Sequence, residues 1–328
     1  MTHPEPIFLA GPDRSGTSLI YTLLASHPNI AMVRRTNMWR YFYGRFGDLS
    51  DAQNLERCLT SMVTFKRMRH LLPDPDRIRR EFQQGEPTYG RLFALFYEHH
   101  AARMGKPRWG DKSLHTEHYA GKILTEYPNA KIIHMMRDPR DRAASMMKRY
   151  EKNQGRVAAA TGRWLSSAKV AQRNQRRYPD NYKVLRYETL VERPEETLRE
   201  VCAFINEAYA PEMLQMDAVP EMKDRGGNSS YGTFERAVIS TRSVGRYREV
   251  LSPSDIRFIE LFAKRDMDRY DYRRDGIDLS LRDGLAFYAA ELPFNSLRMA
   301  GWLALQAWTL NHERIPASKI MADMEEAE

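Results

Sequence analysis

Residues 6–20 read Pro6-Ile7-Phe8-Leu9-Ala10-Gly11-Pro12-Asp13-Arg14-Ser15-Gly16-Thr17-Ser18-Leu19-Ile20. The apolar run at the start predicts a buried strand, and the apolar residues at the end predict a helix that begins at Ser15. A glycine-bounded loop joins the two elements. Such a junction directs free backbone N–H groups and the positive end of a helix dipole at one point, which predicts an anion site.

The loop resembles a phosphate loop with one residue replaced. Its frame, Gly11-x4-Gly16-Thr17-Ser18, matches Gly-x4-Gly-Lys-[Ser/Thr] except that Thr17 stands at the lysine position. A kinase or NTPase needs that lysine on the β- and γ-phosphates and the next hydroxyl on magnesium. Here the cation of the loop is Arg14. The loop therefore predicts phosphate binding without a triphosphate–magnesium complex, which disfavours a kinase.

Composition is that of a soluble globular protein with anionic partners. The chain has 328 residues, of which 42% are hydrophobic and 29% are charged, so it can form one large domain or two modest ones. The net charge is +8, with a pI of about 9.4. This balance favours nucleotides, phosphates, acidic acceptors or an anionic membrane surface as partners.

Two cysteines, Cys58 and Cys202, each lie among apolar residues at helical spacing, which predicts buried free thiols. They offer neither a zinc spacing nor a disulfide framework. Strand-like sequence begins within six residues of Met1, so no secretory signal is expected, and a run of apolar residues long enough to span a membrane is lacking. We therefore expect a cytoplasmic protein without a transmembrane segment.

Strand and helix patterns alternate, which predicts an α/β fold: three α/β/α layers around a central parallel sheet, as in P-loop NTPases. Strands are predicted at 6–10, 108–110, 130–136 and 182–187. Residues 34–106 read as a mostly helical insertion between core units, and residues 218–246 as a long ordered loop or lid. The longest predicted helix covers 157–178, and the last helix of the core covers 256–267.

We expect an α/β core domain over residues 1–275, followed by a C-terminal helical extension over 276–328. The extension contains an apolar stretch, 284–310, interrupted by charges and a proline. This stretch predicts a helix that docks on the core, forms a homodimer contact or lies on a membrane surface.

Polar groups follow three of the predicted strands. Arg14–Ser18 follow the first, Arg137 follows the third and Tyr187 follows the fourth. In open α/β sheets, ligands bind at the carboxyl ends of the strands. Helical spacing from Pro139 turns Ser145 toward the same edge, so that Arg137 and Ser145 predict a second phosphate site.

Five segments resemble sulfotransferases that use 3′-phosphoadenosine 5′-phosphosulfate (PAPS), and nearest to them the bacterial and tyrosylprotein-type branch. They are the loop around Arg14-Ser15-Gly16-Thr17, Trp109-Gly110-Asp111-Lys112-Ser113, Arg137-Asp138-Pro139-Arg140-Asp141-x3-Ser145, Arg186-Tyr187-Glu188, and Ser243-x-Gly245-Arg246-Tyr247. They occur in the family's order over residues 6–270. Each is weak alone, and together they are specific.

The resemblance implies a role for each matching position. The 5′-phosphosulfate of PAPS, and of its product adenosine 3′,5′-bisphosphate, would be held by Arg14, Ser15, Gly16, Thr17 and Ser18. The 3′-phosphate would be held by Arg137 and Ser145, with Ser243, Gly245 and Arg246 closing over it. Tyr187 would contact the adenine. No metal is implied, because fixed cations and N–H donors stabilise the charge on the leaving phosphate.

The acceptor needs a proton acceptor, and here the chain departs from the resemblance. The glutamate expected a few residues after His27-Pro28 is replaced by Arg34 or Arg35, and an arginine is not a base at neutral pH. We expect His115 to be the base and Lys112 to polarise the transferring group together with Arg14. His118 is the second choice, and Asp111 is disfavoured as a carboxylate paired with Lys112.

The acceptor side is predicted in residues 34–106 and 220–240. Arg34, Arg35, Trp39 and His118 are the candidates for contact with a flat or anionic acceptor, the alternative for Trp39 being a place in the helical core. The resemblance implies a small-molecule, glycan or lipid acceptor and no nucleic acid. A non-catalytic nucleotide- or glycan-binding relative is the second interpretation. Asp13, a carboxylate inside a phosphate loop, needs a cationic partner that the sequence does not identify.

Overall fold

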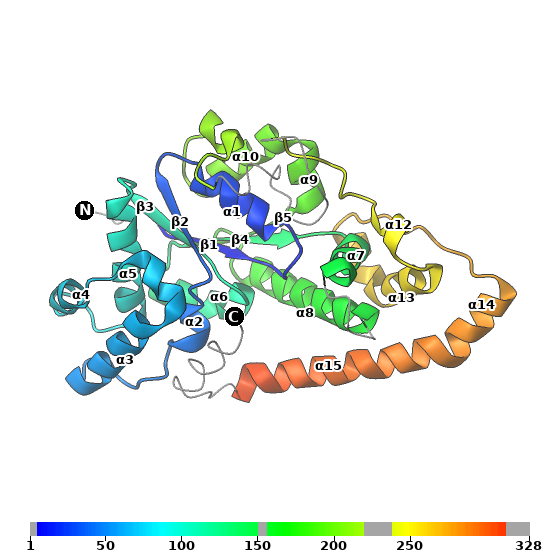
Figure 1. Ribbon diagram of the computed structural model, residues 1–328, viewed down its shortest axis with the longest axis horizontal. Helices are drawn as coiled ribbons and strands as arrows, with labels where there is room; N and C mark the ends of the chain where they lie inside the picture. Colours follow the sequence, from blue (N-terminus) through cyan, green and yellow to red (C-terminus); the bar gives the residue numbers. More distant parts are fainter. Residues whose placement is uncertain (1–4, 150–155, 220–237, 313–328) are drawn as a thin grey trace.

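The computed structural model describes residues 5–149, 156–219 and 238–312. Five parallel strands form one sheet in the order β2-β3-β1-β4-β5 (Figure 1). The strands are β1 (Ile7–Ala10), β2 (Ile30–Arg34), β3 (Arg108–Lys112), β4 (Lys131–Met136) and β5 (Tyr182–Arg186). The parallel sheet and the α/β class that the alternation predicts are confirmed.

Helices cover both faces of the sheet. The helices of the first half are α1 (Thr17–Ala25), α2 (Met38–Tyr41), α3 (Ala52–Thr64), η1 (Lys66–Leu71), α4 (Pro75–Phe82), α5 (Tyr89–Arg103), η2 (Thr116–Tyr119) and α6 (Ala120–Glu126). Those that follow β4 are α7 (Pro139–Arg149), α8 (Arg156–Arg177), α9 (Tyr187–Glu192), α10 (Pro194–Phe204), η3 (Pro211–Gln215), α12 (Tyr247–Val250), α13 (Pro253–Arg269), α14 (Leu281–Ala286), the π-helical segment η4 (Phe287–Glu291) and α15 (Leu292–His312). Helices α1, α9 and α10 lie on one side of the sheet, and α6 and α8 on the other (Figure 1).

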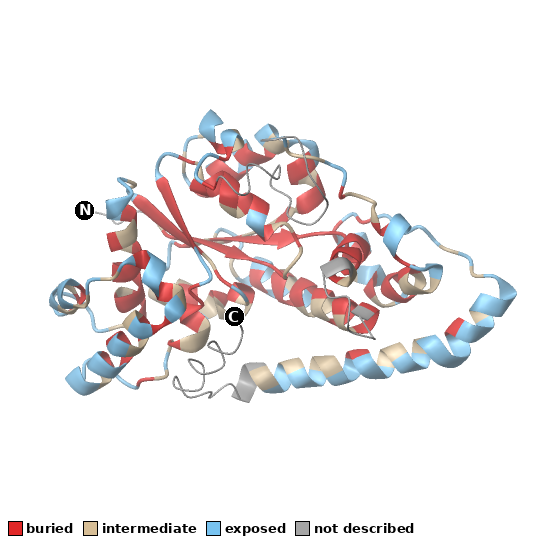
Figure 2. Cartoon of the chain, viewed as in Figure 1, coloured by how far each residue is buried: buried red, intermediate tan, exposed pale blue. Residues whose placement is uncertain are grey.

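The alternation of side chains along β1 explains the two cores. Ile7 and Leu9 face α1, α9 and α10, whereas Phe8 and Ala10 face the helices of the insertion. Successive residues of a strand point to opposite faces, so a strand buried on both sides is apolar throughout. All four residues of β1 are buried, and Figure 2 shows the sheet as the buried centre of the molecule.

One strand was not predicted. Residues 30–34 form β2 at the edge of the sheet, paired with β3 from Ile30 opposite Arg108 to Arg34 opposite Lys112. The run Ile-Ala-Met-Val between His27-Pro28 and the basic residues is short, and only its pairing with β3 distinguishes it from a loop. Consequently Arg137 follows the fourth strand of the chain and Tyr187 the fifth. Between β2 and β3 the chain is mostly helical, as predicted.

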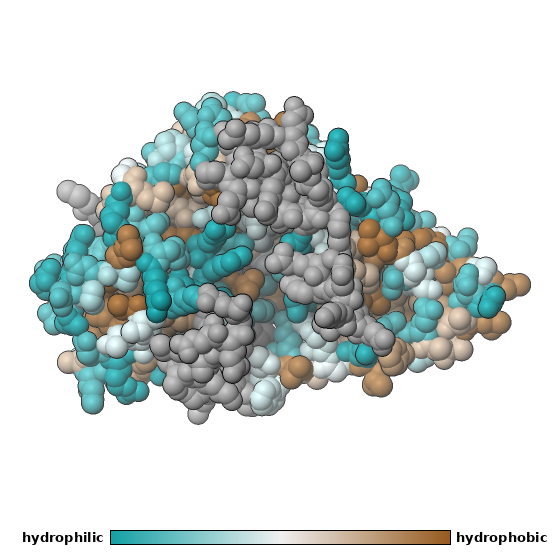
Figure 3. Space-filling view, in the orientation of Figure 1, coloured by the Kyte–Doolittle hydropathy of each residue, from teal (hydrophilic) through white to brown (hydrophobic). Residues whose placement is uncertain are grey.

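The C-terminal segment packs on the core along part of its length. Helix α15 lies against α8, where a side chain on Gly162 would come within 3.1 Å of Met299 and Trp302. The other face of the segment is apolar and exposed: Leu281, Leu285, Phe294, Leu297, Leu305 and Trp308. Figure 3 shows hydrophobic surface on this arm at the lower right. A homodimer or membrane contact through this face stays a prediction.

Three smaller expectations can be compared with the structure. Cys58 and Cys202 are buried free thiols, as predicted. Of the predicted lid, residues 220–237 lie outside the described residues. Within the described residues, no helix is long and apolar enough to cross a membrane.

Candidate functional site

The register of the sheet brings the predicted site residues to one edge. Leu9 lies opposite Lys112 of β3, and Lys112 lies opposite Arg34 of β2. On the other side of β1, Ala10 lies opposite His134 of β4. The loop after β1 therefore begins between the carboxyl ends of β3 and β4, where ligands of open parallel sheets bind.

Two glycines allow the loop to fold tightly. Gly11 has φ 118°, and a Cβ atom there would lie 2.5 Å from the carbonyl oxygen of Met135. Gly16 has φ 87°, and a Cβ atom there would lie 2.3 Å from Cδ2 of Tyr187. Both positions need glycine for conformation and for space. Helix α1 begins immediately after Gly16, and its first N–H groups are not capped by a side chain.

Two buried polar atoms at this loop lack partners. The hydroxyl of Ser15 is buried, and its Oγ has no hydrogen-bond partner within the described residues. The same holds for Nε of Arg137, a residue that is 4% exposed. Because buried polar groups are almost always paired in folded proteins, both atoms fit a polar ligand such as a phosphate.

The arginines of two motifs meet at the loop. Arg14, whose φ is 66°, donates from Nε to Oγ of Ser145 at 2.9 Å. Arg137 donates from Nη1 to the Arg14 carbonyl at 3.3 Å and from Nη2 to the Ser243 carbonyl at 2.7 Å. The guanidinium of Arg137 lies over the ring of Tyr187, 4.6 Å from its centroid. The structure thus brings Arg14, Arg137 and Ser145 together.

The late loop closes over the same side. The Tyr187 hydroxyl and the Ser243 hydroxyl are 2.7 Å apart. The Asp141 carboxylate accepts the N–H groups of Gly245 at 2.8 Å and Tyr247 at 2.9 Å. Sequence reasoning placed Asp141 in its motif but assigned it no task. One feature of the sequence could have indicated this role: Asp141 is an acidic residue between arginines. A carboxylate in such a place is able to hold a loop by accepting hydrogen bonds from its backbone N–H groups.

Asp13 has the cationic partners that the loop requires. Its Oδ1 lies 2.7 Å from Nη2 of the fully buried Arg142 and 3.2 Å from Nη1 of Arg163. Burial raises the pKa of this carboxyl, but the charges of Arg142 and Arg163 outweigh burial and hold the pKa at about 2. Asp13 therefore anchors the loop to α7 and α8 rather than opposing an anion inside it.

Lys112 reaches the helix end of the loop. Its Nζ lies 3.4 Å from the Ser18 hydroxyl. Burial and the neighbouring charges of Arg35 and Arg34 together lower the pKa of the ammonium to about 8. Positive charge is thus concentrated beside the phosphate loop, and a bound anion would relieve the repulsion.

Asp111 is not placed to serve as a surface base. It is fully buried, and its Oδ1 accepts the hydroxyls of Thr36 at 3.0 Å and Ser113 at 3.1 Å. Burial raises its pKa to about 6, although these two hydrogen bonds favour the charged form. Asp111 ties β3 to the residues that follow β2, in a buried polar cluster that also includes Tyr97.

His115 and His118 lie near each other after β3, with ring centroids 6.0 Å apart. His115 precedes η2 with φ 64°, and its side chain does not cap that helix. Burial lowers the pKa of both rings, so both are neutral at pH 7. The buried Glu117 lies between them in sequence, and its Oε2 is 3.4 Å from the N–H of Gly11. Sequence reasoning missed this carboxylate, which contacts the phosphate loop directly.

The four acceptor candidates separate in the structure. Arg34 and Arg35 are exposed at the sheet edge beside Lys112, and neither forms an ion pair within the described part of the chain. Trp39 is 3% exposed and packs edge-on against Phe8 and Phe93. It belongs to the core, which was the alternative for this residue. His118 is only half-buried.

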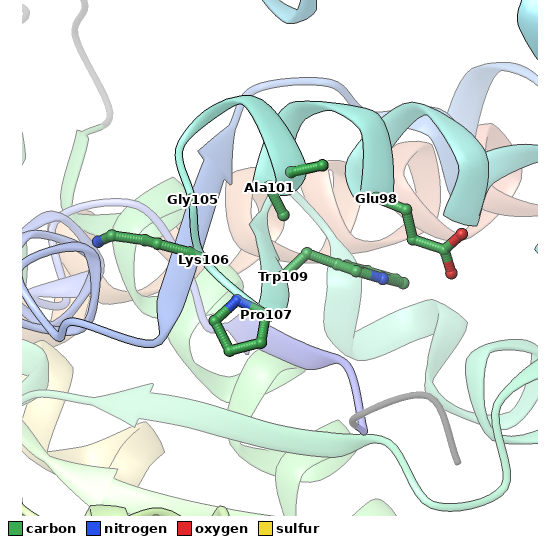
Figure 4. Close-up of a pocket in the computed structure, with 7 residues that line it drawn as sticks. Glu98, Ala101, Gly105, Lys106, Pro107 and Trp109 are labelled. Carbon is green, nitrogen blue, oxygen red and sulfur yellow. The ribbon is translucent and has the colours of Figure 1, made fainter. Parts of the chain in front are cut away.

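Arg246 lies at the start of α12, with its Nε 3.6 Å from the Glu249 carboxylate. Within residues 5–149, 156–219 and 238–312, no group of three or more His, Cys, Asp or Glu side chains could hold a metal ion. A hollow of about 450 Å³ lies by Trp109 at the opposite end of β3 (Figure 4). There Lys106 points away from the hollow and donates to the carbonyls of Ala25, His27 and Ile30, so polar groups do not converge on it.

Known proteins resemble this chain over most of its length. A sequence profile described as “Sulfotransferase family” matches residues 6–211. An uncharacterized protein of Aquifex aeolicus is 25% identical over 227 residues, which are 65% of this chain and 27% of that protein. The chain thus spans about a quarter of that relative.

Two solved structures share the fold. The sulfotransferase domain of the Synechococcus PCC 7002 olefin synthase has a TM-score of 0.53 at 19% identity, covering 84% of this chain and 96% of that domain. The sulfotransferase domain from the curacin biosynthetic pathway has a TM-score of 0.54 at 17% identity, covering 82% and 98%. Both support the same arrangement of a parallel sheet flanked by helices.

Proposed function

Because the chain belongs to the sulfotransferase family, we propose that it transfers the sulfuryl group of PAPS to a hydroxyl or amine of an acceptor. The acceptor class is a small molecule, glycan or lipid. We also propose that the protein acts in the cytoplasm, where buried free thiols such as Cys58 and Cys202 persist.

The observation that carries the proposal is the pair of buried atoms without partners, Oγ of Ser15 and Nε of Arg137. They lie on the two motifs that would hold the two phosphate groups of the donor. Leaving a buried polar atom unpaired costs about 1–3 kcal/mol, and a phosphate oxygen bound at each of the two atoms would supply the missing partner. The missing lysine at Thr17 agrees with a ligand that needs no magnesium.

Each nucleotide contact has a proposed residue. Arg14, the hydroxyls of Ser15, Thr17 and Ser18, and the N–H of Gly16 would hold the 5′ end. Arg137 and Ser145 would bind the 3′-phosphate, and Tyr187 would contact the adenine. Ser243, Gly245 and Arg246 would complete that side. In this arrangement Arg14 is shared between both ends, because its guanidinium already contacts Ser145 at 2.9 Å.

The donor supplies an activated sulfuryl group whose leaving group is a phosphate. The acceptor oxygen forms a bond to sulfur as the bond from sulfur to the phosphate oxygen breaks. The acceptor's proton passes to a ring nitrogen of His115, which is neutral at pH 7 because burial lowers its pKa. Lys112 and Arg14 stabilise the negative charge that develops between sulfur and the leaving phosphate.

A non-catalytic nucleotide-binding relative is the second candidate. It is favoured by the exposed Arg34 and Arg35, which stand where the resemblance places a glutamate base. The two functions differ in turnover and not in binding, so one protein preparation distinguishes them.

The test begins with thermal unfolding. Adenosine 3′,5′-bisphosphate should raise the melting temperature, and ATP with magnesium should have little effect. Breakdown of PAPS in the absence of an acceptor, measured as release of sulfate, should occur in the wild type and should be lost in His115→Asn. Absence of stabilisation by the bisphosphate would contradict the proposal, and stabilisation with no breakdown or transfer would favour the non-catalytic relative.

A further inference from the structure

A second cavity lies along the free edge of β2. It has a volume of about 190 Å³ and is bounded by α1, β2, η1 and the end of α5. Its polar lining consists of Tyr21, Arg34, His70 and His100. The remaining lining is apolar and includes Met32 and Met104. The proposed function leaves His70 and His100 without a task.

Among the residues that the structure describes, the charged groups that act on this cavity's histidines have one sign. The rings of His70 and His100 are 6.4 Å apart. Burial lowers the pKa of both rings, that of His100 to about 4. The charged neighbours that lower these pKa values further are Arg34 for His70, and Arg103 together with His70 for His100. Within the described residues, no carboxylate contributes to either shift, so the cavity concentrates donors and cations with no anion among them.

The apolar wall restricts the chemistry of the ligand. At ~30 Å³ for each water of the liquid, the cavity has room for about six waters, or for a short organic chain. A site with an apolar wall on one side and an arginine with two imidazoles on the other fits an organic anion. The guanidinium fork pairs best with a planar carboxylate.

Arg34 connects this cavity to the proposed reaction site. It lies opposite Lys112 in the sheet, and its charge lowers the pKa of that lysine. On its other side it lies over the ring of Tyr21, with its Cζ 5.9 Å from the ring centroid. Arg34 therefore lines the cavity and also neighbours Lys112, the residue that the proposed function places beside the transferring sulfuryl group.

We propose that the β2-edge cavity binds the carboxylate end of the acceptor, so that the acceptor is a short hydroxy acid held by Arg34, His70 and His100. The part of this inference that concerns sulfation rests on the proposed function. The part that concerns binding of a carboxylate rests on the cavity alone.

Hexanoate is the probe for the anion, and hexanamide is its neutral counterpart. Calorimetric titration of the full chain, saturated with adenosine 3′,5′-bisphosphate, should show that hexanoate binds at least tenfold more tightly than hexanamide. Arg34→Gln should weaken hexanoate binding about 10- to 100-fold, the loss expected for one charge-assisted contact. Arg57→Gln, which removes an exposed arginine on α3 away from the cavity, should leave the affinity unchanged.

The pKa of His100 provides a second measurement, which would not change on hexanoate binding if His70 and His100 had only a structural role. A proton NMR titration should show the pKa of His100 rising from about 4 when hexanoate binds, because a nearby anion favours the charged ring. Besides each other, the charged groups that act on the two rings are Arg34 and Arg103, and neither changes charge between pH 5 and 8. The shift should vanish in Arg34→Gln and should persist in Arg57→Gln.

Turnover completes the test. The wild type should sulfate 6-hydroxyhexanoate with a higher kcat/KM than 1-hexanol, and Arg34→Gln should remove the difference. Equal binding of hexanoate and hexanamide, or hexanoate binding unaffected by Arg34→Gln, overturns the inference. If the bisphosphate does not bind while hexanoate, titrated into the chain without nucleotide, shows the expected dependence on Arg34, the proposed function fails and the anion site stands.

Discussion

Arg14 donates a hydrogen bond from Nε to Oγ of Ser145 at 2.9 Å, and so joins two motifs that are 131 residues apart in the chain. The contact places the loop after β1 against the helix after β4. The two motifs that we propose bind anions thus share one surface, which is the relationship a ligand with two phosphate groups requires.

Arg137→Gln should lower the affinity for adenosine 3′,5′-bisphosphate by about 1.5–3 kcal/mol, because a charge-assisted contact is lost. Arg137→Lys should recover part of the affinity, since the charge returns without the two-pronged geometry. Calorimetry measures both. Arg193→Gln, an exposed arginine on α10's N-terminal side, is the control and should bind as the wild type does. Equal affinity of all variants would remove Arg137 from the nucleotide site.

Gly16→Ala should destabilise the protein and weaken nucleotide binding, because its Cβ would lie 2.3 Å from the Tyr187 ring. Gly44→Ala is the matched control: φ is also positive, at 71°, but no atom lies within 4 Å of the added Cβ. The control should lose about 1–2 kcal/mol from conformation alone. Gly16→Ala should lose more. Thermal unfolding with and without the bisphosphate measures this, and equal losses would mean that the Tyr187 contact is unimportant.

Asp13→Asn should reduce the free energy of unfolding by about 3 kcal/mol, because it leaves the fully buried Arg142 without its counter-charge. The pKa of Asp13, about 2, lies below the ordinary value of 3.8. Its stabilising effect is therefore complete above pH 4 and is lost as the pH falls toward 2. Urea unfolding at pH 7 measures the change. Asp76→Asn, which breaks an exposed pair with Arg79, should cost less than 1 kcal/mol.

The affinity for adenosine 3′,5′-bisphosphate should fall as the pH rises through about 8. Burial and the neighbouring arginines lower the pKa of Lys112 to that value, so the lysine loses its charge there in the unliganded protein. Binding of the anion must then take up a proton, which costs affinity above pH 8. Lys112→Arg should bind with less dependence on pH between 7 and 9. Calorimetry in buffers of different ionisation enthalpy counts the protons, and a profile identical to the wild type would contradict the assignment.

His115→Asn should lower sulfuryl transfer by about 10²–10⁴-fold and leave nucleotide binding intact. Asparagine is chosen because φ at this position is 64°, a conformation that asparagine tolerates better than alanine. His118→Asn should have a smaller effect. If His118→Asn is the more damaging variant, the base is His118, and the order of the two candidates is wrong.

The sequence by itself determined the class of fold and the edge of the sheet at which the candidate site is expected. Local rules of periodicity and backbone conformation are enough for this. They predict a strand from the apolar run of β1, a tight loop from Gly11 and Gly16, and an α/β fold from the alternation of strands with helices. Those rules do not reach β2, whose five residues form a strand because β3 offers them a pairing edge.

The tertiary structure decided which charges meet. The partners of Asp13, the loop that Asp141 holds and the buried cluster around Asp111 join residues far apart in the chain. It also placed Trp39 in the core and Arg34 beside Lys112, although Trp39 and Arg34 are close together in the sequence. A residue's type predicts what chemistry it can do. Its burial and its neighbours, which only packing sets, decide its pKa and whether a ligand can reach it.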